Sequence, residues 1–347
     1  MTKVSVLTPT YRHASFIGDC IRSVLAQSEP DWEMIIVDDG SDDGTQEIAE
    51  SFDDKRITVI RLEHVGVTGL GRIYATALAK AKSPIVAVLE GDDTWPAKKL
   101  EEELPLFNDP NVVLAYGAAG LMDEKGCVYA RFWYAPHGKV AMNDPAGTIL
   151  PALVDVNFIV PATVMLRRSA LEQIGGFIQP NGVPYVDHPT WLQLATVGTF
   201  ARSSLELGNW RRHSGQVTTK SWFDTAPNRA SYLHTVAAEA NGLLKADVAA
   251  SLASSIRRDP SRQYEDAMIG RARVALLDGR WREAASLFMK LLLTGEIRNK
   301  AVATLGILCS IGRTDMERVI GAMGRHSLPS RRHLASHSED ESKSWTT

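Results

Sequence analysis

Short apolar runs alternate with helical patterns through the first 120 residues, and this alternation limits the fold more than any other feature of the chain. Strand-like runs occupy 4–8, 34–37, 57–62 and 85–89, and apolar residues recur at helical spacing between them. Strand, crossover helix and strand in this order predict an α/β fold in which helices flank a mostly parallel central sheet. In such a sheet, ligands bind beyond the carboxyl ends of the strands.

The pattern changes after about residue 226 and becomes helical. Small and apolar residues around 272–276 and 284–292 flank a turn at Asp278-Gly279, which predicts an αα-hairpin, and a further helix is expected over 300–310. Residues 327–347 are rich in serine, histidine and charged side chains, a composition typical of a disordered tail. We therefore expect an α/β domain over 1–222, an all-helical C-terminal region over 226–325 and a tail over 327–347.

Composition excludes several classes of protein. The 347 residues carry a formal net charge of −3, which argues against a nucleic-acid partner. Cys20, Cys127 and Cys309 are far apart, and each is expected to be reduced and buried, as in a cytoplasmic protein. The uncharged stretch 301–312 is shorter than the ~20 residues of a membrane-spanning helix. Weak association with the inner face of a membrane stays open, as does a homodimer formed through the apolar helical region.

Two acidic clusters follow predicted strands. The first, "VDDGSDDGTQEIAE" at 37–50, has the spacing of an EF-hand calcium loop, but an apolar strand precedes it where an EF-hand needs a helix. The second, "VLEGDDTWPAKKL", places Glu90, Asp92 and Asp93 after the strand 85–89. Residues two apart on an extended chain point the same way, so Glu90 and Asp92 could reach one Mn²⁺ or Mg²⁺. A solvated loop or an acidic helix start near Pro96 is the alternative.

Five segments between about residues 3 and 220 form a pattern through their sequences, order and spacing. They read "VSVLTPTYRHASFIGDCIRSVLAQSEPDWEMIIVDDGSDDGT", "LEGDD", "NFIVPATVMLRRSALEQIGGF", "VDHPTWLQLATVG" and "RRHSGQVT". In this order and spacing the sequence resembles the family-2 inverting glycosyltransferases. The resemblance implies a Rossmann-like GT-A domain that moves a sugar from a nucleotide-diphosphate sugar, expected to be a UDP-sugar, to a hydroxyl acceptor. The acceptor would be a saccharide or lipid-linked molecule in polysaccharide or glycolipid synthesis.

The resemblance also implies roles for individual residues. Mn²⁺ or Mg²⁺ would be held by Asp92, Asp93 and His213, where the family's DxD motif reads ExD. An aromatic side chain and a turn proline suit a flat base, and guanidinium groups suit a diphosphate. The implied nucleotide-binding residues are Pro9, Thr10, Tyr11, Asp38, Asp39, Arg72, Glu90, Arg211 and Arg212.

Asp187 aligns with the catalytic aspartate of the family's "ED" motif. It would act as the general base that takes the proton of the acceptor hydroxyl. Val186 stands in place of the preceding glutamate, and Pro189 replaces a common acidic residue. These departures leave a second hypothesis open, a catalytically degenerate nucleotide-sugar-binding domain whose helical region is a partner-docking module. A dinucleotide-dependent oxidoreductase is excluded, because no GxGxxG follows the first strand.

Overall fold

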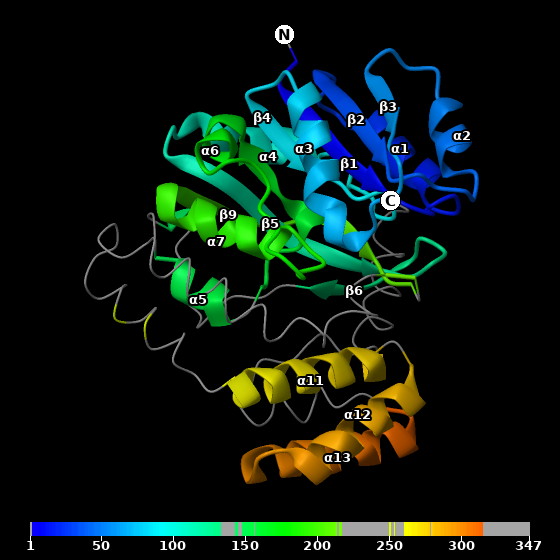
Figure 1. The fold of residues 1–347 in the computed structure, drawn as a ribbon, viewed down its shortest axis with the longest axis vertical. Helices are drawn as coiled ribbons and strands as arrows, with labels where there is room; N and C mark the ends of the chain where they lie inside the picture. The colour runs from blue at the N-terminus through cyan, green and yellow to red at the C-terminus, as the bar shows by residue number, and fades with distance from the viewer. Residues whose placement is uncertain are drawn as a thin grey trace, which may run out of the picture. The chain divides into compact units, whose positions relative to one another are not determined.

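The computed structural model describes residues 2–132, 143–144, 148–155, 157–213, 215–216, 250, 253, 260–277 and 279–314. The chain divides into two compact units, Met1–Arg257 and Arg258–Thr347. The first unit contains the β-sheet and the second contains three of the described helices (Figure 1). The change in composition near 226 falls in 217–249, outside the described residues.

The first half of the sheet unit follows the predicted alternation of strands and helices. Its elements are β1 (Val4–Thr10), α1 (Ile17–Leu25), β2 (Trp32–Asp38), α2 (Thr45–Glu50), β3 (Ile57–Arg61), η1 (Val67–Gly69), α3 (Leu70–Lys80), β4 (Ile85–Val88), α4 (Lys99–Glu103) and η2 (Leu104–Asn108). The second half contains β5 (Val112–Met122), β6 (Val128–Phe132), β7 (Asn143–Asp144), α5 (Leu150–Asp155), η4 (Pro161–Thr163), β8 (Met165–Arg167), α6 (Arg168–Gln173), α7 (Asp187–Val197) and β9 (Thr199–Arg211).

The strands form one sheet in the order β3-β2-β1-β4-β8-β5-β9-β7, with β6 paired to β5. The first four strands are parallel neighbours, as the alternation of strands and helices predicts. β8 then runs antiparallel to both β4 and β5, while β5 and β9 are again parallel. The irregular pattern after residue 121 predicts none of these later pairings, because β8 has only three residues and β7 only two.

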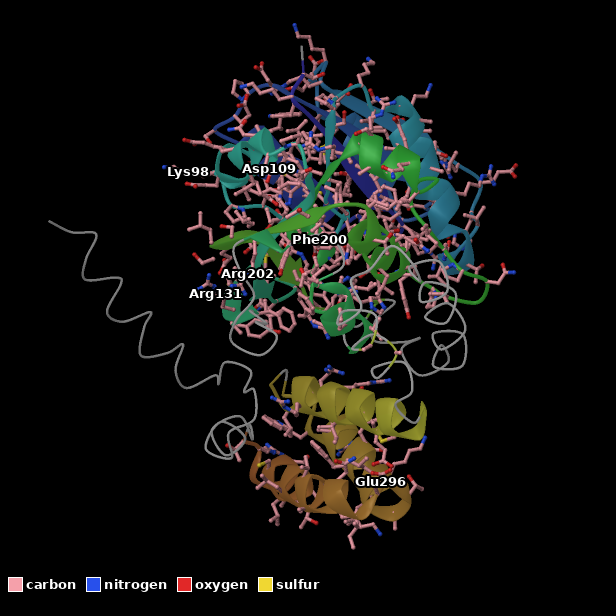
Figure 2. The ribbon with its side chains drawn as sticks, turned by 90° about the vertical axis from the view of Figure 1, so that its left-hand side faces the viewer. Lys98, Asp109, Arg131, Phe200, Arg202 and Glu296 are labelled. Carbon is pink, nitrogen blue, oxygen red and sulfur yellow. The ribbon has the colours of Figure 1, made fainter. Side chains whose placement is uncertain are left out.

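Helices cover both faces of the sheet, so the unit has two cores. Alternate strand residues point to opposite faces: Leu7 belongs to the core that includes residues of α3, α6 and α7, whereas Val6 belongs to the core that includes residues of α1 and α4. Phe200 of β9 is fully buried, whereas the labelled Lys98 lies at the edge of the unit (Figure 2). The predicted α/β fold with a mostly parallel sheet flanked by helices is confirmed.

The described residues of the second unit, called the helical unit below, form α11 (Pro260–Leu277), α12 (Trp281–Thr294) and α13 (Ile297–Gly312). Ala272 and Leu276 of α11 are buried, as are Ala284 and Phe288 of α12. Gly306 of α13 lies against the Phe288 ring, which an added Cβ would approach to 2.4 Å. The predicted αα-hairpin is therefore present in α11 and α12, and the third helix begins at 297 rather than 300.

Two further expectations from the sequence concern the burial of the cysteines and the presence of a membrane-spanning helix. Cys20 and Cys309 are buried as expected, but Cys127 lies exposed in the turn between β5 and β6, so the expectation of burial is wrong there. That turn is built on Asp123, whose carboxylate accepts the backbone N–H of Lys125 and of Cys127 at 2.9 Å. In the part of the chain that the structure describes, no helix has the length and apolar character needed to cross a membrane.

Candidate active site

The carboxyl ends of β1, β2 and β4 lie side by side, because the three strands are parallel neighbours. The register pairs Thr10 with Asp38, and the backbone N–H of Gly91 donates to the carbonyl oxygen of Pro9 at 3.0 Å. A Cβ at Gly91 would lie 2.5 Å from Thr10 Oγ1, so only glycine permits this approach. The acidic segments after β2 and β4 therefore meet at one edge of the sheet.

The loop after β2 is a scaffold for the turn after β1. Side-chain oxygens of the loop accept three consecutive backbone N–H groups: Arg12 donates to Ser41 Oγ (2.8 Å), His13 to Thr45 Oγ1 (2.9 Å) and Ala14 to Asp43 Oδ2 (3.1 Å). Arg12 has a left-handed backbone with φ of 52°, which turns the chain back toward this loop. Asp43 also accepts the N–H of Thr45 at the start of α2, a capping role.

Asp38 and Asp39 have different surroundings. Asp38 is fully buried, and its carboxylate accepts the N–H of Ser41 at 3.0 Å, so it shapes the loop from within. The Asp39 carboxylate accepts the N–H groups of Val65 at 2.8 Å and Gly66 at 3.0 Å. Asp39 therefore ties the end of β2 to the segment that follows β3.

His64 joins Asp39 to Tyr11. Its Nδ1 lies 2.8 Å from Asp39 Oδ2, and its ring stacks on the Tyr11 ring with centroids 4.2 Å apart and planes at 19°. His64 is not among the residues predicted from the sequence, because only the fold brings residue 64 beside residue 11. Its position two residues after the predicted strand 57–62 is the one available sequence signal. Asp39, Tyr11 and His64 thus form a polar and aromatic group at one side of the site.

Glu90, Asp92 and Asp93 form the acidic cluster expected after β4, with carboxylate oxygens within 4.8 Å of one another. Burial, together with the charges of Asp92 and Asp187, raises the pKa of Glu90 to about 8, although the hydroxyl of Tyr74 donates to it at 3.2 Å. Burial and the two neighbouring carboxylates also raise the pKa of Asp93 well above its ordinary value. The cluster therefore concentrates negative charge at the end of β4.

Asp92 differs from its neighbours because two imidazoles face it. Burial raises its pKa, but His13 and His213 outweigh burial and lower the pKa to about 2. His213 Nε2 lies 3.0 Å from Asp92 Oδ2, and His13 Nε2 lies 3.9 Å from the same oxygen. Like His64, His13 is not among the residues predicted from the sequence.

Asp187 begins α7, and the Nδ2 of Asn157 donates to its Oδ2 at 2.7 Å. Burial raises the pKa of Asp187, and its charge in turn raises the pKa of both Glu90 and Tyr74. The fold therefore brings Asp187 close to the acidic cluster after β4, although about 100 residues separate them in the chain. The ring of the adjacent His188 has another contact: it is buried, and its Nε2 lies 2.7 Å from the Leu153 carbonyl oxygen.

The expected arginines lie in three settings. The fully buried Arg211 donates to the carbonyl oxygens of Asp92 at 2.7 Å and Glu124 at 3.0 Å, and its backbone N–H donates to Asp93 Oδ1 at 2.8 Å. Arg211 therefore holds the acidic loop in place. The guanidinium of Arg212 lies over the Trp210 ring, 4.4 Å from its centroid. Arg72 is exposed on the first turn of α3, with no side-chain partner among the described residues.

Gln179 links the loop before α3 to the segment before α7. Its Oε1 accepts the N–H of Gly71 at 2.6 Å, and its Nε2 donates to the carbonyl oxygens of Val67 at 2.7 Å and Val183 at 2.8 Å. This side chain therefore couples the position of the loop near Arg72 to that of the segment leading into Asp187. No sequence signal identified it.

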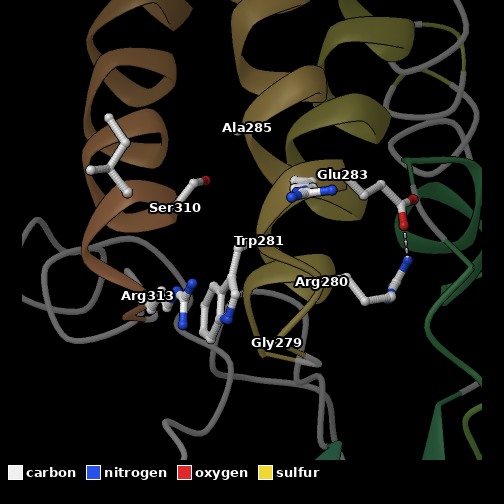
Figure 3. Close-up of a pocket in the computed structure, with 9 residues that line it drawn as sticks. Gly279, Arg280, Trp281, Glu283, Ala285, Ser310 and Arg313 are labelled. Carbon is white, nitrogen blue, oxygen red and sulfur yellow. Dashed lines mark hydrogen bonds and ion pairs between the residues drawn. The ribbon is translucent and has the colours of Figure 1, made fainter.

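The helical unit has a pocket of its own, at the turn before α12 and the end of α13 (Figure 3). Its lining includes Trp281, Ser310 and Arg313, together with Glu283, which is ion-paired with Arg280. None of the residues expected to bind nucleotide or metal lies there. The sheet unit is therefore where the candidate active site is found.

Comparison with known proteins agrees with this geometry. The family model of glycosyl transferase family 2 matches residues 5–175. TuaG of Bacillus subtilis (strain 168), a protein assigned to teichuronic acid biosynthesis as a glycosyltransferase, is 34% identical over 222 residues, which are 63% of this chain and 82% of TuaG.

Two solved structures are similar in fold. S. aureus TarS 1–349 in complex with UDP-GlcNAc has a TM-score of 0.57 at 16% identity, covering 94% of this chain and 93% of that one. The mannosyltransferase PcManGT of Pyrobaculum calidifontis, in complex with GDP-Man and Mn²⁺, has a TM-score of 0.52 at 19% identity, covering 89% and 80%. The expected GT-A fold is confirmed. The fold, the family model and the similarity to TuaG together show that this chain is an enzyme of glycosyltransferase family 2.

Proposed function

We propose that the protein is an inverting glycosyltransferase that moves a sugar from a UDP-sugar to a hydroxyl acceptor, saccharide or lipid-linked, during glycan synthesis. One observation carries the proposal. The Asp187 carboxylate at the start of α7 is close enough to Glu90 for its charge to raise the Glu90 pKa, and carboxylate oxygens of Glu90 and Asp92 lie within 4.8 Å of each other. The proposed base for the acceptor and the proposed anchor for the donor's phosphates would thus share one site. The complex of TarS with UDP-GlcNAc and the assignment of TuaG to teichuronic acid biosynthesis support this reading.

The base of the donor is proposed to bind at Tyr11 and Asp39, next to Pro9 and Thr10. Tyr11 and His64 offer stacked aromatic surface for a flat ring. Asp39 already accepts two backbone N–H groups, but an ionised carboxylate has about four acceptor positions and can take a further N–H from a base. Asp38 is assigned a structural role in the loop.

The diphosphate and its cation are proposed to lie beside Asp92. A divalent cation fits these residues, because carboxylate oxygens of Glu90, Asp92 and Asp93 and an imidazole nitrogen of His213 are gathered there. When bound, Mn²⁺ or Mg²⁺ would neutralise charge on the departing nucleoside diphosphate. Arg72 and Arg212 are the proposed phosphate contacts, whereas Arg211 positions the acidic loop.

Asp187 is the proposed general base. In an inverting transfer, the acceptor oxygen forms a bond to the anomeric carbon while the bond from that carbon to the diphosphate breaks, and one carboxylate takes the hydroxyl proton. Burial raises the pKa of Asp187, which makes its carboxylate a stronger base, and Asn157 orients it.

A comparison of two variants tests these roles. Asp187→Asn should bind UDP-sugar in a thermal-shift assay as the parent does, yet lose sugar transfer by about 10²- to 10⁴-fold. Asp92→Ala should instead lose the stabilisation that UDP gives together with Mn²⁺. Asp53→Asn, at an exposed acid away from the site, is the control. Full transfer activity in Asp187→Asn would overturn the assignment of the base, and an unchanged shift in Asp92→Ala would overturn that of the phosphate anchor.

A further inference from the structure

Two imidazoles and one carboxylate meet at the end of β4. The ligand atoms of His13, Asp92 and His213 all lie within 4.8 Å of one another. We propose that His13 is a ligand of the divalent cation together with Asp92 and His213, and that this two-histidine set gives the enzyme a preference for Mn²⁺ over Mg²⁺. The inference rests on the proposed function, to which it adds a ligand and a metal preference.

The distances suit a common metal ion. His13 Nε2 and His213 Nε2 lie 3.9 Å and 3.0 Å from the same Asp92 oxygen. Two ligands that each bind a metal at about 2.1 Å lie roughly 3 to 4 Å apart, depending on the angle between them. One ion can therefore contact all three side chains after small rotamer adjustments.

His13 is held in an orientation suited to metal binding. Its Nδ1 lies 3.2 Å from Thr10 Oγ1, and its backbone N–H donates to Thr45 Oγ1. The tautomer with its proton on Nδ1 donates to Thr10 and leaves Nε2 to bind a metal. A hydrogen bond at the second ring nitrogen is the usual support of a metal-binding histidine. The loop after β2 thus contributes to the proposed metal site without contacting the ion, because its hydrogen bonds fix the turn that carries His13.

The two histidines also fix each other's position. Their rings meet edge to face with centroids 6.1 Å apart, and the Phe16 ring lies against His213 with centroids 4.8 Å apart. His213 is only 9% exposed at its side chain and His13 18%. These rings are therefore packed into the site and are not part of a solvated surface.

The alternative is an all-carboxylate set made of Glu90, Asp92 and Asp93. Both of the other acids already have protein partners: Asp93 Oδ1 accepts the N–H of Arg211, and Glu90 Oε1 accepts the hydroxyl of Tyr74. Asp92 Oδ2 instead faces the imidazoles. The two sets differ in selectivity. Carboxylate oxygen suits Mg²⁺, Ca²⁺ and Mn²⁺ alike, whereas imidazole nitrogen suits transition-metal ions, so two imidazole ligands disfavour Mg²⁺ more than Mn²⁺.

Metal binding by the full chain separates the two sets. Mn²⁺ is titrated alone and with UDP, its affinity is measured by electron paramagnetic resonance, and bound nitrogen is detected by its ¹⁴N coupling in spin-echo spectra. The parent protein should show coupling from imidazole nitrogen. His13→Ala should weaken that coupling and lower Mn²⁺ affinity by about 10- to 100-fold, while Mg²⁺ affinity falls less. His13→Gln, which keeps a polar side chain, guards against misfolding as the cause.

His64→Ala is the matched control, since it removes a histidine at the Tyr11 side of the site and should leave the ¹⁴N coupling unchanged with Mn²⁺ alone. If both His13 variants keep the parent's coupling and affinity while Asp92→Ala loses Mn²⁺, the two-histidine set is wrong and the proposed function stands. If Asp92→Ala also binds Mn²⁺ as the parent does, the metal assignment of the proposed function fails with it.

Discussion

Single residues in this protein control both close packing and local charge at the site. Gly91 is the clearest packing case, because its backbone touches the side chain of Thr10 where β1 and β4 end. Glu90 is the clearest charge case, because burial and two neighbouring carboxylates act on it together. Each leads to a measurable expectation.

Gly91→Ala should destabilise the sheet unit. The new Cβ would lie 2.5 Å from Thr10 Oγ1 and 2.8 Å from Thr10 Cβ, so the two strand ends must separate. Overpacking of this kind costs about 1 to 3 kcal/mol of unfolding free energy, measurable by urea denaturation. Gly270→Ala in α11 is the matched control: its Cβ would meet nothing within 4 Å, and the better helix former should stabilise. Equal effects of the two substitutions would contradict this account.

Glu90 should make stability depend on pH. A carboxyl whose pKa rises from 4.5 in the unfolded chain to about 8 in the folded one binds more protons when folded, so its contribution to stability is lost as pH rises through this window. In protein kept metal-free with EDTA, Glu90→Gln should therefore melt higher than the parent at pH 8, with a smaller difference at pH 5. Identical melting temperatures at both pH values would show that Glu90 titrates normally.

At the scale of elements, the site depends on where helices and strands begin and end. α7 begins at Asp187, and the segment before η4 supplies Asn157, whose hydrogen bond to Asp187 joins the two. Gln179 adds a second link, between the segment before α7 and the loop before α3. Asp187, the proposed base, is thus positioned by several elements at once.

Removal of the Asn157 contact should change the pH profile of the enzyme. This hydrogen bond lowers the pKa of Asp187, against the effect of burial, so Asn157→Ala should raise that pKa further. The acid limb of kcat/KM against pH should then move to higher pH, and kcat should fall by about tenfold or more, while donor KM changes little. Asn111→Ala, at an exposed asparagine, is the control. If the acid limb does not move, Asn157 does not influence the titration of Asp187 during transfer.

At the scale of the whole molecule, all proposed donor contacts come from the unit Met1–Arg257, and none comes from Arg258–Thr347. UDP with Mn²⁺ at 100 times its Kd stabilises the folded state that binds it by about 2.7 kcal/mol. Hydrogen exchange should therefore slow at the ends of β1, β2 and β4 and stay unchanged in α11, α12 and α13. Equal protection in the helices would mean that the second unit takes part in donor binding.

The sequence by itself determined the parallel half of the sheet, the three-helix unit and the acids at the strand ends, because periodicity, turn residues and strand ends are local signals. Only the tertiary structure placed β8 antiparallel between β4 and β5, buried Arg211 under the acidic loop, and brought His13 and His64 to Asp92 and Asp39. The contacts of His64 with Asp39 and of Arg211 with Asp92 join residues 25 and 119 positions apart. They depend on turns such as the left-handed Arg12 and on which strands are neighbours, and neither can be read from the spacing of residues along a chain.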